Sequence, residues 1–70
     1  MSLKTSDPRY HLDFARWEGE DSVFEGCVVS RYTKIGGKAM VVLEDDRGLN
    51  HIYPDNPKRL TIIRKGAPRP

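Results

Sequence analysis

Residues 38–60 constrain the fold of this chain more than any other segment. They contain an apolar, β-branched run at 39–43, an acidic stretch that ends in glycine at 44–48, and a second short run at 49–53. Two runs joined by such a turn predict a β-hairpin. Prolines follow the second run, and because a proline lacks the N–H that a paired strand donates, the chain must turn there. The sequence therefore predicts one more strand after this turn, at 59–63.

Two segments upstream of this hairpin also have features of strands. Residues 10–14 alternate apolar and polar side chains, which predicts a half-buried strand, although a short amphipathic helix is the competing interpretation. Residues 22–33 are rich in β-branched and aromatic side chains, and Gly26 in their middle predicts a bulge or a sharp bend. The stretches 18–21 and 35–37 contain glycine and are predicted to be turns.

Short strands, tight turns and a proline-rich elbow before the last strand describe an all-β chain. The pattern resembles an SH3-like barrel, with about five strongly bent antiparallel strands and a short helical turn before the last one, here at 55–58. We expect a disordered lead at 1–9, one barrel domain at 10–64 and a flexible basic tail at 65–70. The run at 39–43 is apolar on both faces and is predicted to be the most buried strand. The expected core residues are Phe14, Val23, Val28, Val41, Leu43, Ile52, Leu60 and Ile62.

The length of 70 residues indicates one domain. Such a domain buries only about 60% of its unfolded surface, so its stability is marginal and a homo-oligomer is expected. The single cysteine, Cys27, excludes an internal disulfide, and no group of cysteine and histidine has the spacing of a zinc site. No apolar run approaches the roughly 18 residues that span a bilayer, and residues 1–6 lack an apolar signal core. We therefore expect a cytoplasmic protein with no membrane partner and no metal.

The net charge of +2 is small, but the charges are segregated along the chain. Five acids and one base lie between Asp13 and Glu25, whereas five bases and no acid lie from residue 58 onward. Such a separation steers an anionic partner to one end, although a merely solvated basic end is the alternative. Trp17, Tyr32 and Tyr53 are interleaved with bases, a combination that stacks on nucleobases and pairs with phosphates, although large aromatics in a small barrel usually belong to its core. The predicted nucleic-acid-binding residues are Arg31, Tyr32, Lys34, Lys38, Tyr53, Lys58, Arg59, Arg64 and Lys65.

Few residues have the pattern of a catalytic site. His51 lies on a predicted strand, which favours a structural histidine, because a general acid or a hydrogen-bond donor to a ligand also needs a positioned partner. Cys27 is followed by two valines, which favours a buried side chain over a nucleophile. The acids at 44–46 are interpreted as turn chemistry, because three adjacent positions do not converge on one metal ion. Residues 36–38 lack the spacing and the helix of a phosphate-binding loop.

Two short motifs resemble the plasmid-borne type II dihydrofolate reductases, namely Phe-Glu-Gly at 24–26 and His-Ile-Tyr-Pro at 51–54. In that family an aromatic-Gln-Gly opens the corresponding region, and Val-Gln-Ile-Tyr followed by Pro lines a single pore in the middle of a tetramer. His51 stands where the family has Gln, whereas Ile52 and Tyr53 match. The resemblance implies an SH3-like fold, an oligomeric enzyme with NADPH as its cofactor, and these three residues at the pore.

We expect a small non-enzymatic binding module that uses no cofactor and whose partner is nucleic acid. A protein-binding adaptor is the near alternative, and an oligomeric NADPH-dependent dihydrofolate reductase is the alternative from a different class. The acids at 18–21 lie near where the reductase family carries lysines for anionic ligands. Because these acids repel a phosphorylated cofactor, the enzyme is the second choice.

Overall fold

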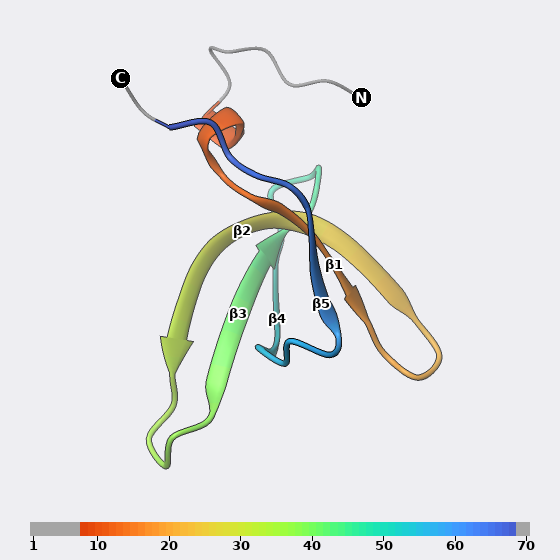
Figure 1. Cartoon of the computed structure of the whole chain (residues 1–70), viewed down its shortest axis with the longest axis vertical. Helices are drawn as coiled ribbons and strands as arrows, with labels where there is room; N and C mark the ends of the chain where they lie inside the picture. The colour runs from red at the N-terminus through yellow and green to blue at the C-terminus, as the bar shows by residue number, and fades with distance from the viewer. Residues whose placement is uncertain (1–7, 69–70) are drawn as a thin grey trace.

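The computed structural model describes residues 8–68 as one short 3-10 helix and five strands (Figure 1). The elements are η1 Pro8–His11, β1 Phe14–Glu18, β2 Val23–Thr33, β3 Ala39–Glu44, β4 Asn50–Pro54 and β5 Leu60–Arg64. All five strands form one antiparallel sheet in the order β4-β3-β2-β1-β5, so the last strand returns to pair with the first. The predicted all-β class is confirmed. Within the described range, no helix has the length and apolar character needed to cross a membrane.

The long strand β2 connects the two halves of the sheet. Its first part pairs with β1 as far as Phe14↔Cys27, and its second part pairs with β3 as far as Thr33↔Ala39. β1 and β3 pair with successive parts of β2 on its two edges, and β2 bends strongly along its length, so that the whole sheet curls (Figure 1). The edge strands β4 and β5 do not pair with each other in the described part of the chain, so the sheet curls without closing.

Gly26 lies in the part of β2 where the two halves meet. A Cβ atom at this position would lie 2.6 Å from the carbonyl oxygen of Glu44, so any other residue would displace the backbone. The break in register against β3 lies farther along β2, between Val28 and Ser30. The glycine in the middle of this strand therefore permits the close approach of two backbones, and the bulge itself forms at Val29.

The first strand begins later than the alternation of residues 10–14 predicted. Pro8–His11 form the 3-10 helix η1, and the Leu12 amide donates a hydrogen bond of 3.0 Å to the Arg9 carbonyl. Proline presets the φ angle of a helical turn, which favours η1 over an extended chain at this point. The strand prediction is wrong except at Phe14, the residue at which β1 begins.

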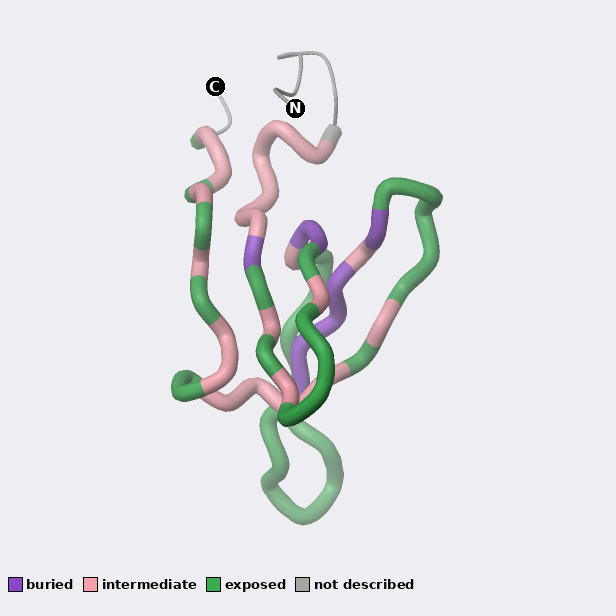
Figure 2. Tube along the Cα trace, turned by 90° about the vertical axis from the view of Figure 1, so that its right-hand side faces the viewer, coloured by how far each residue is buried: buried purple, intermediate pink, exposed green. Residues whose placement is uncertain are grey.

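The centre of the core consists of Ala15, Val41 and Leu43, which have no exposed surface. Two of the three belong to β3, which is the most buried strand, as predicted, and Figure 2 shows its run of buried residues. The half-buried residues that pack against this centre are Trp17, Phe24, Val28, Tyr53, Leu60 and Ile62. The core thus lies inside the curl of the sheet, between β3 and the β1–β5 pair.

Three residues of the expected core lie outside it, and one of them, Phe14, is half-buried without packing against the centre. Val23 is 61% exposed and Ile52 is 55% exposed. Successive side chains of a strand point to opposite faces, so only one of two adjacent apolar residues reaches the core. On β2 this residue is Phe24, and on β4 it is Tyr53. The sequence-based core is wrong at Phe14, Val23 and Ile52, because each lies one position away from the inward-facing residue, which on β1 is Ala15.

A single helical turn precedes β5, where the proline-rich elbow predicted one. The carbonyl of Asn56 accepts hydrogen bonds from the amides of Arg59 and Leu60, both at 2.9 Å. The amide of Asp55 donates to the carbonyl of Ala39 at 3.0 Å. The elbow is therefore fastened to the start of β3, beside the connection between β2 and β3.

The segment after β5 lies beside the segment before β1 (Figure 1). The Gly66 amide donates a hydrogen bond of 2.8 Å to Asp13 Oδ1. The lead expected at 1–9 is described only from residue 8 onward, where η1 begins, and the rest of it lies outside the described residues. The tail expected at 65–70 is described as far as residue 68, and its first part is joined to the N-terminal segment by this hydrogen bond.

Candidate functional site

The predicted nucleic-acid-binding residues fall on three separate parts of the molecule. One group lies on the hairpin that joins β2 to β3, a second at the elbow before β5, and a third at the end of β5. The hairpin group is Arg31, Tyr32, Lys34 and Lys38. The elbow group is Tyr53, Lys58 and Arg59, and the third group is Arg64 and Lys65.

The hairpin between β2 and β3 extends beyond the rest of the sheet, and residues 31–39, here called the arm, are all exposed (Figure 2). The strand pairing continues to Thr33↔Ala39, after which the Lys34 amide donates to the Lys38 carbonyl at 2.8 Å. The turn itself contains two glycines with positive φ angles of 101° and 92°, which non-glycine residues rarely adopt. Hydrogen bonds and glycines together make the arm a defined two-stranded ribbon.

The arm contains three basic residues and no acidic residue. Arg31 lies at the end of the arm nearest to the rest of the sheet, where it forms an ion pair of 3.5 Å with Asp55 of the elbow. The Arg31 side chain is 51% exposed. Lys34 and Lys38, nearer the tip, form no ion pair with any residue of the range 8–68. Tyr32 is 40% exposed and lies opposite Met40 in the ladder. The arm therefore presents uncompensated positive charge beside an accessible aromatic ring.

At the elbow, two of the predicted residues are engaged within the chain. The ring of Tyr53 stacks on that of Trp17, with 4.5 Å between centroids and 20° between planes. The Arg59 guanidinium lies 5.9 Å from the Trp17 ring centroid and donates to the Glu18 carbonyl at 3.0 Å. Lys58 is exposed, and three positions before it the Asp55 amide is bonded to the Ala39 carbonyl. Of this group, therefore, Lys58 is the residue that is left available to a ligand.

The third group lies at the other end of the molecule, where the chain leaves β5 (Figure 1). Arg64 donates to the Leu12 carbonyl at 3.3 Å, and Lys65 lies 3.7 Å from the Asp13 carboxylate. Both bases thus contact the segment that precedes β1. The structure does not bring them together with the arm.

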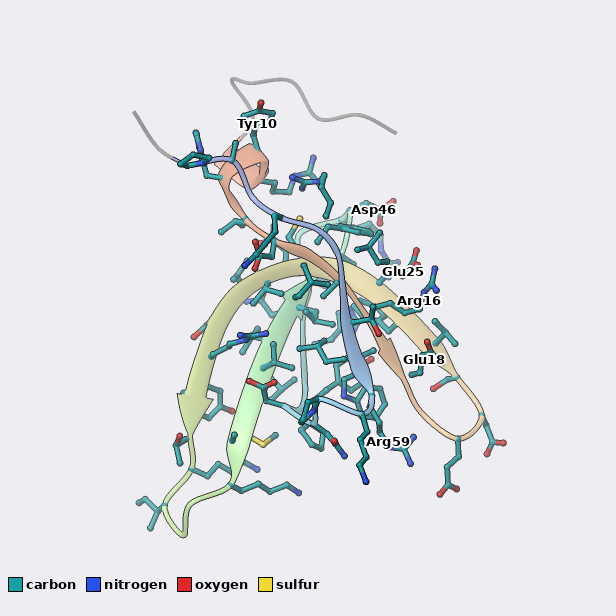
Figure 3. The ribbon with its side chains drawn as sticks, viewed as in Figure 1. Tyr10, Arg16, Glu18, Glu25, Asp46 and Arg59 are labelled. Carbon is teal, nitrogen blue, oxygen red and sulfur yellow. The ribbon has the colours of Figure 1, made fainter. Side chains whose placement is uncertain are left out.

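Acidic residues occupy the opposite end of β2. Figure 3 shows Glu18 and Glu25 along the β1–β2 hairpin, with Arg59 near the start of β5. Arg16 forms an ion pair of 2.8 Å with Glu25, which leaves the acids of the connecting loop as the excess charge. The segregation predicted between residues 13–25 and the bases from residue 58 onward is not kept in space, because Arg59 bonds to the Glu18 carbonyl and Lys65 pairs with Asp13. Charge is instead separated along β2, with the acidic loop at its first end and the bases of the arm at its last.

His51 is held by the turn between β3 and β4. Its Nε2 atom lies 2.9 Å from Asp45 Oδ2, and its ring packs on Phe24 with 4.3 Å between centroids. The hydrogen bond to His51, followed by that from the Leu49 amide, lowers the pKa of Asp45 from 3.8 to about 2. These contacts are those of a structural histidine and a turn aspartate. Among the described residues, no group of three His, Cys, Asp or Glu side chains is placed to hold a metal ion.

The three residues that the reductase resemblance singled out lie on both faces of β4. His51 and Tyr53 lie opposite the fully buried Leu43 and Val41, whereas Ile52 lies between them on the other face and is exposed. Within one chain, therefore, these three side chains do not line a common surface.

One residue of the arm was not singled out by its sequence. Ile35 lies at the tip between a lysine and two glycines, and its side chain is fully exposed. Sequence alone assigned it to a connection, although an isolated isoleucine beside a glycine pair is a signal of an apolar turn tip. No protein-family model, curated protein or solved structure matches the chain.

Proposed function

We propose that this chain is a small non-enzymatic binding module that binds nucleic acid through its arm. The observation that carries the proposal is the accumulation of Arg31, Lys34 and Lys38 on a fully exposed ribbon that contains no acid. Phosphate groups supply most of the free energy of such binding, because each one neutralised by a base releases condensed counterions. Because the ribbon projects beyond the rest of the sheet, its basic residues reach phosphates without a clash between the sheet and the duplex.

The SH3-like assignment of the fold belongs to the same proposal. The last strand returns beside the first, a helical turn precedes it, and one long bent strand is shared by both halves of the sheet. These features resemble an SH3-like barrel. Barrels of this size serve many functions, so the fold supports a binding role and the arm supplies its chemistry.

The surface has a defined composition and orientation. Phosphates are contacted by four basic residues, Arg31, Lys34, Lys38 and Lys58. Tyr32 offers an exposed ring on which a nucleobase can stack. The acidic loop at the other end of β2 repels phosphates and thereby orients the ligand toward the arm. Tyr53 does not contribute, since its ring is stacked on Trp17.

The proposal is tested by fluorescence anisotropy of a labelled duplex titrated with the protein at several salt concentrations. Three phosphate contacts, or four when Arg31 leaves its ion pair with Asp55, predict a slope of about −3 to −4 in the plot of log affinity against log salt. Replacing Lys34 and Lys38 together with Gln should reduce the magnitude of the slope by about 2.

A matched control separates the arm from charge in general. Lys38→Gln and Lys65→Gln remove the same charge, the first from the arm and the second from the opposite end, where the side chain is 83% exposed. We expect only Lys38→Gln to weaken binding and lower the slope. Equal effects of the two variants, or no binding at low salt, would refute the proposal. Recovery of a protein partner after nuclease treatment, without nucleic-acid binding, would favour the adaptor alternative.

A further inference from the structure

The tip of the arm presents a single large apolar side chain to solvent. Ile35 has a relative exposure of 107%, so no part of the described chain covers it. Other exposed aliphatic residues, such as Val23 and Ile52, lie on strands and are 61% and 55% exposed. Ile35 is therefore the most accessible apolar group among residues 8–68, and it lies in the turn that closes the arm between Lys34 and Lys38.

The tip is also narrow. Gly36 and Gly37 follow Ile35, and a Cβ atom placed on either glycine would meet no other atom within 4 Å. The Gly37 amide donates to the Lys34 carbonyl at 2.9 Å, which closes the turn tightly. Beyond the Lys34 and Lys38 pair, the ribbon thus carries one isoleucine and two residues without side chains. The two-stranded part of the arm has the width that a major groove admits, whereas the tip, with one side chain, is the part slim enough for a minor groove of roughly 6 Å.

We propose that the arm enters the minor groove of duplex DNA and that Ile35 wedges between two adjacent base pairs, so that the duplex bends. This inference rests on the proposed function and specifies its ligand. Lys34 and Lys38 flank the wedge and contact the phosphates on the two sides of the groove. Apolar side chains inserted in this way unstack a base step and bend the duplex, typically by about 20–90° toward the major groove.

The composition of the arm favours the minor groove over the major groove. Residues 31–39 contain none of Asn, Gln, Asp or Glu, which read adenine and cytosine in the major groove, and their Arg and Lys side chains can read only guanine there. The arm instead combines bases with an apolar tip, which suits backbone contacts and readout of deformability. We therefore expect tighter binding to duplexes that contain a flexible TA step than to those with a stiff A-tract.

Chemistry and size favour DNA over the other ligands of an exposed isoleucine. A stable protein interface buries roughly 800 Å² on each partner, far more than one side chain at a narrow tip provides. A lipid surface would be held by the lysines and the isoleucine together, and this occupant is distinguished by the experiment. A duplex uses each feature of the tip, because phosphates and a base step lie within a few ångströms of each other in the groove.

The experiment measures bending and binding on the same duplex. A short DNA with a central TA step carries a donor and an acceptor dye at its ends, so that energy transfer reports bending and anisotropy reports binding. We expect the protein to raise energy transfer, Ile35→Ser to abolish the rise while keeping the salt slope, and Ile35→Leu to retain it. Ile52→Ser removes an exposed isoleucine from the barrel and should change neither readout.

Each outcome decides the inference. Bending that survives in Ile35→Ser, or salt-dependent binding of the unmodified protein without bending, overturns the wedge and leaves the proposed function intact. If the unmodified protein does not bind the duplex at any salt concentration, both the wedge and the proposed function are overturned. Vesicles of phosphatidylcholine and phosphatidylserine serve as the second probe, and vesicle binding that requires Ile35, together with an unbent duplex, assigns the tip to a lipid surface and overturns the inference.

Discussion

His51 and Asp45 form a hydrogen-bonded pair, 2.9 Å between Nε2 and Oδ2, that closes the connection between β3 and β4. The second carboxylate oxygen, Oδ1, accepts hydrogen bonds from the amides of Arg47 and Leu49, both at 2.9 Å. One side chain therefore satisfies two amides of the turn and fixes the imidazole, which packs on Phe24. The pair links the turn to the core and places the one histidine of β4 in a structural role.

This pair predicts a loss of stability in acid. The pKa of Asp45 is about 2 in the folded protein, below its ordinary value of 3.8. Because the folded-state pKa is lowered, the unfolded chain binds the proton first, and stability rises with pH across this window. The contribution is fully present above about pH 4 and is lost as the pH falls through 3.8 toward 2.

Urea unfolding between pH 3 and pH 6 measures this effect. We expect Asp45→Asn to have a smaller dependence of its unfolding midpoint on pH than the unmodified protein. Asp46→Asn, which changes an exposed neighbour in the same turn, is the control and should follow the unmodified protein. An acid dependence that is the same in Asp45→Asn would show that this carboxylate is not responsible.

The position of the core predicts opposite results for two substitutions. Leu43→Ala removes a side chain with no exposed surface and should lower the free energy of unfolding by about 2–5 kcal/mol. Ile52→Ala removes one that is 55% exposed from the adjacent strand and should cost much less, about 1 kcal/mol or below. Chemical denaturation of both variants checks the pair. Equal losses would place Ile52 in the core after all.

The sequence predicted the all-β class and the number of strands better than it predicted which side chains of each strand point into the core. Val41 and Leu43 were recognised because β3 is apolar on both faces, so that either facing gives a buried residue. Phe24 and Tyr53 were missed because each has an apolar neighbour, and the period of two does not say which of them points inward. Which of the two neighbours points inward is decided by pairing with strands that are distant in the sequence, and the local pattern carries no information about that pairing.

The same limit applies to the candidate site. Lys34 and Lys38 lie close in sequence on one hairpin, so their proximity follows from a turn that the glycine pair predicts. Arg64 and Lys65 also lie in a basic stretch, but they lie apart from the arm because β5 runs antiparallel beside β1 and ends at the opposite end of the sheet. A cluster of charges in sequence becomes a surface only after the topology is known.

The reductase alternative makes a prediction about assembly and cofactor. A pore lined by His51, Ile52 and Tyr53 requires all three side chains to be available, whereas His51 is bonded to Asp45 and Tyr53 is stacked on Trp17. We therefore expect no oxidation of NADPH in the presence of dihydrofolate, as followed by absorbance alongside sizing by light scattering. A tetramer whose turnover is abolished by Tyr53→Phe would overturn the proposal of a non-enzymatic module.

The ion pair between Arg31 and Asp55 predicts a substitution that tightens nucleic-acid binding. Their charged atoms lie 3.5 Å apart, so the carboxylate at the elbow offsets the base nearest to it on the arm. Asp55→Asn frees Arg31 for phosphate and should steepen the salt slope by up to about 1. Because partly exposed ion pairs contribute roughly 0–1 kcal/mol, the fold should be little affected.

The matched control for this substitution is Glu25→Gln. It removes the same charge, also from an ion-paired carboxylate, but at the acidic end of β2, where Arg16 is the partner. If the arm is the binding surface, affinity for a duplex at fixed salt should rise several-fold in Asp55→Asn and much less in Glu25→Gln. A comparable rise in both variants would indicate that only net charge matters, and the arm would then not be the site at which the nucleic acid binds.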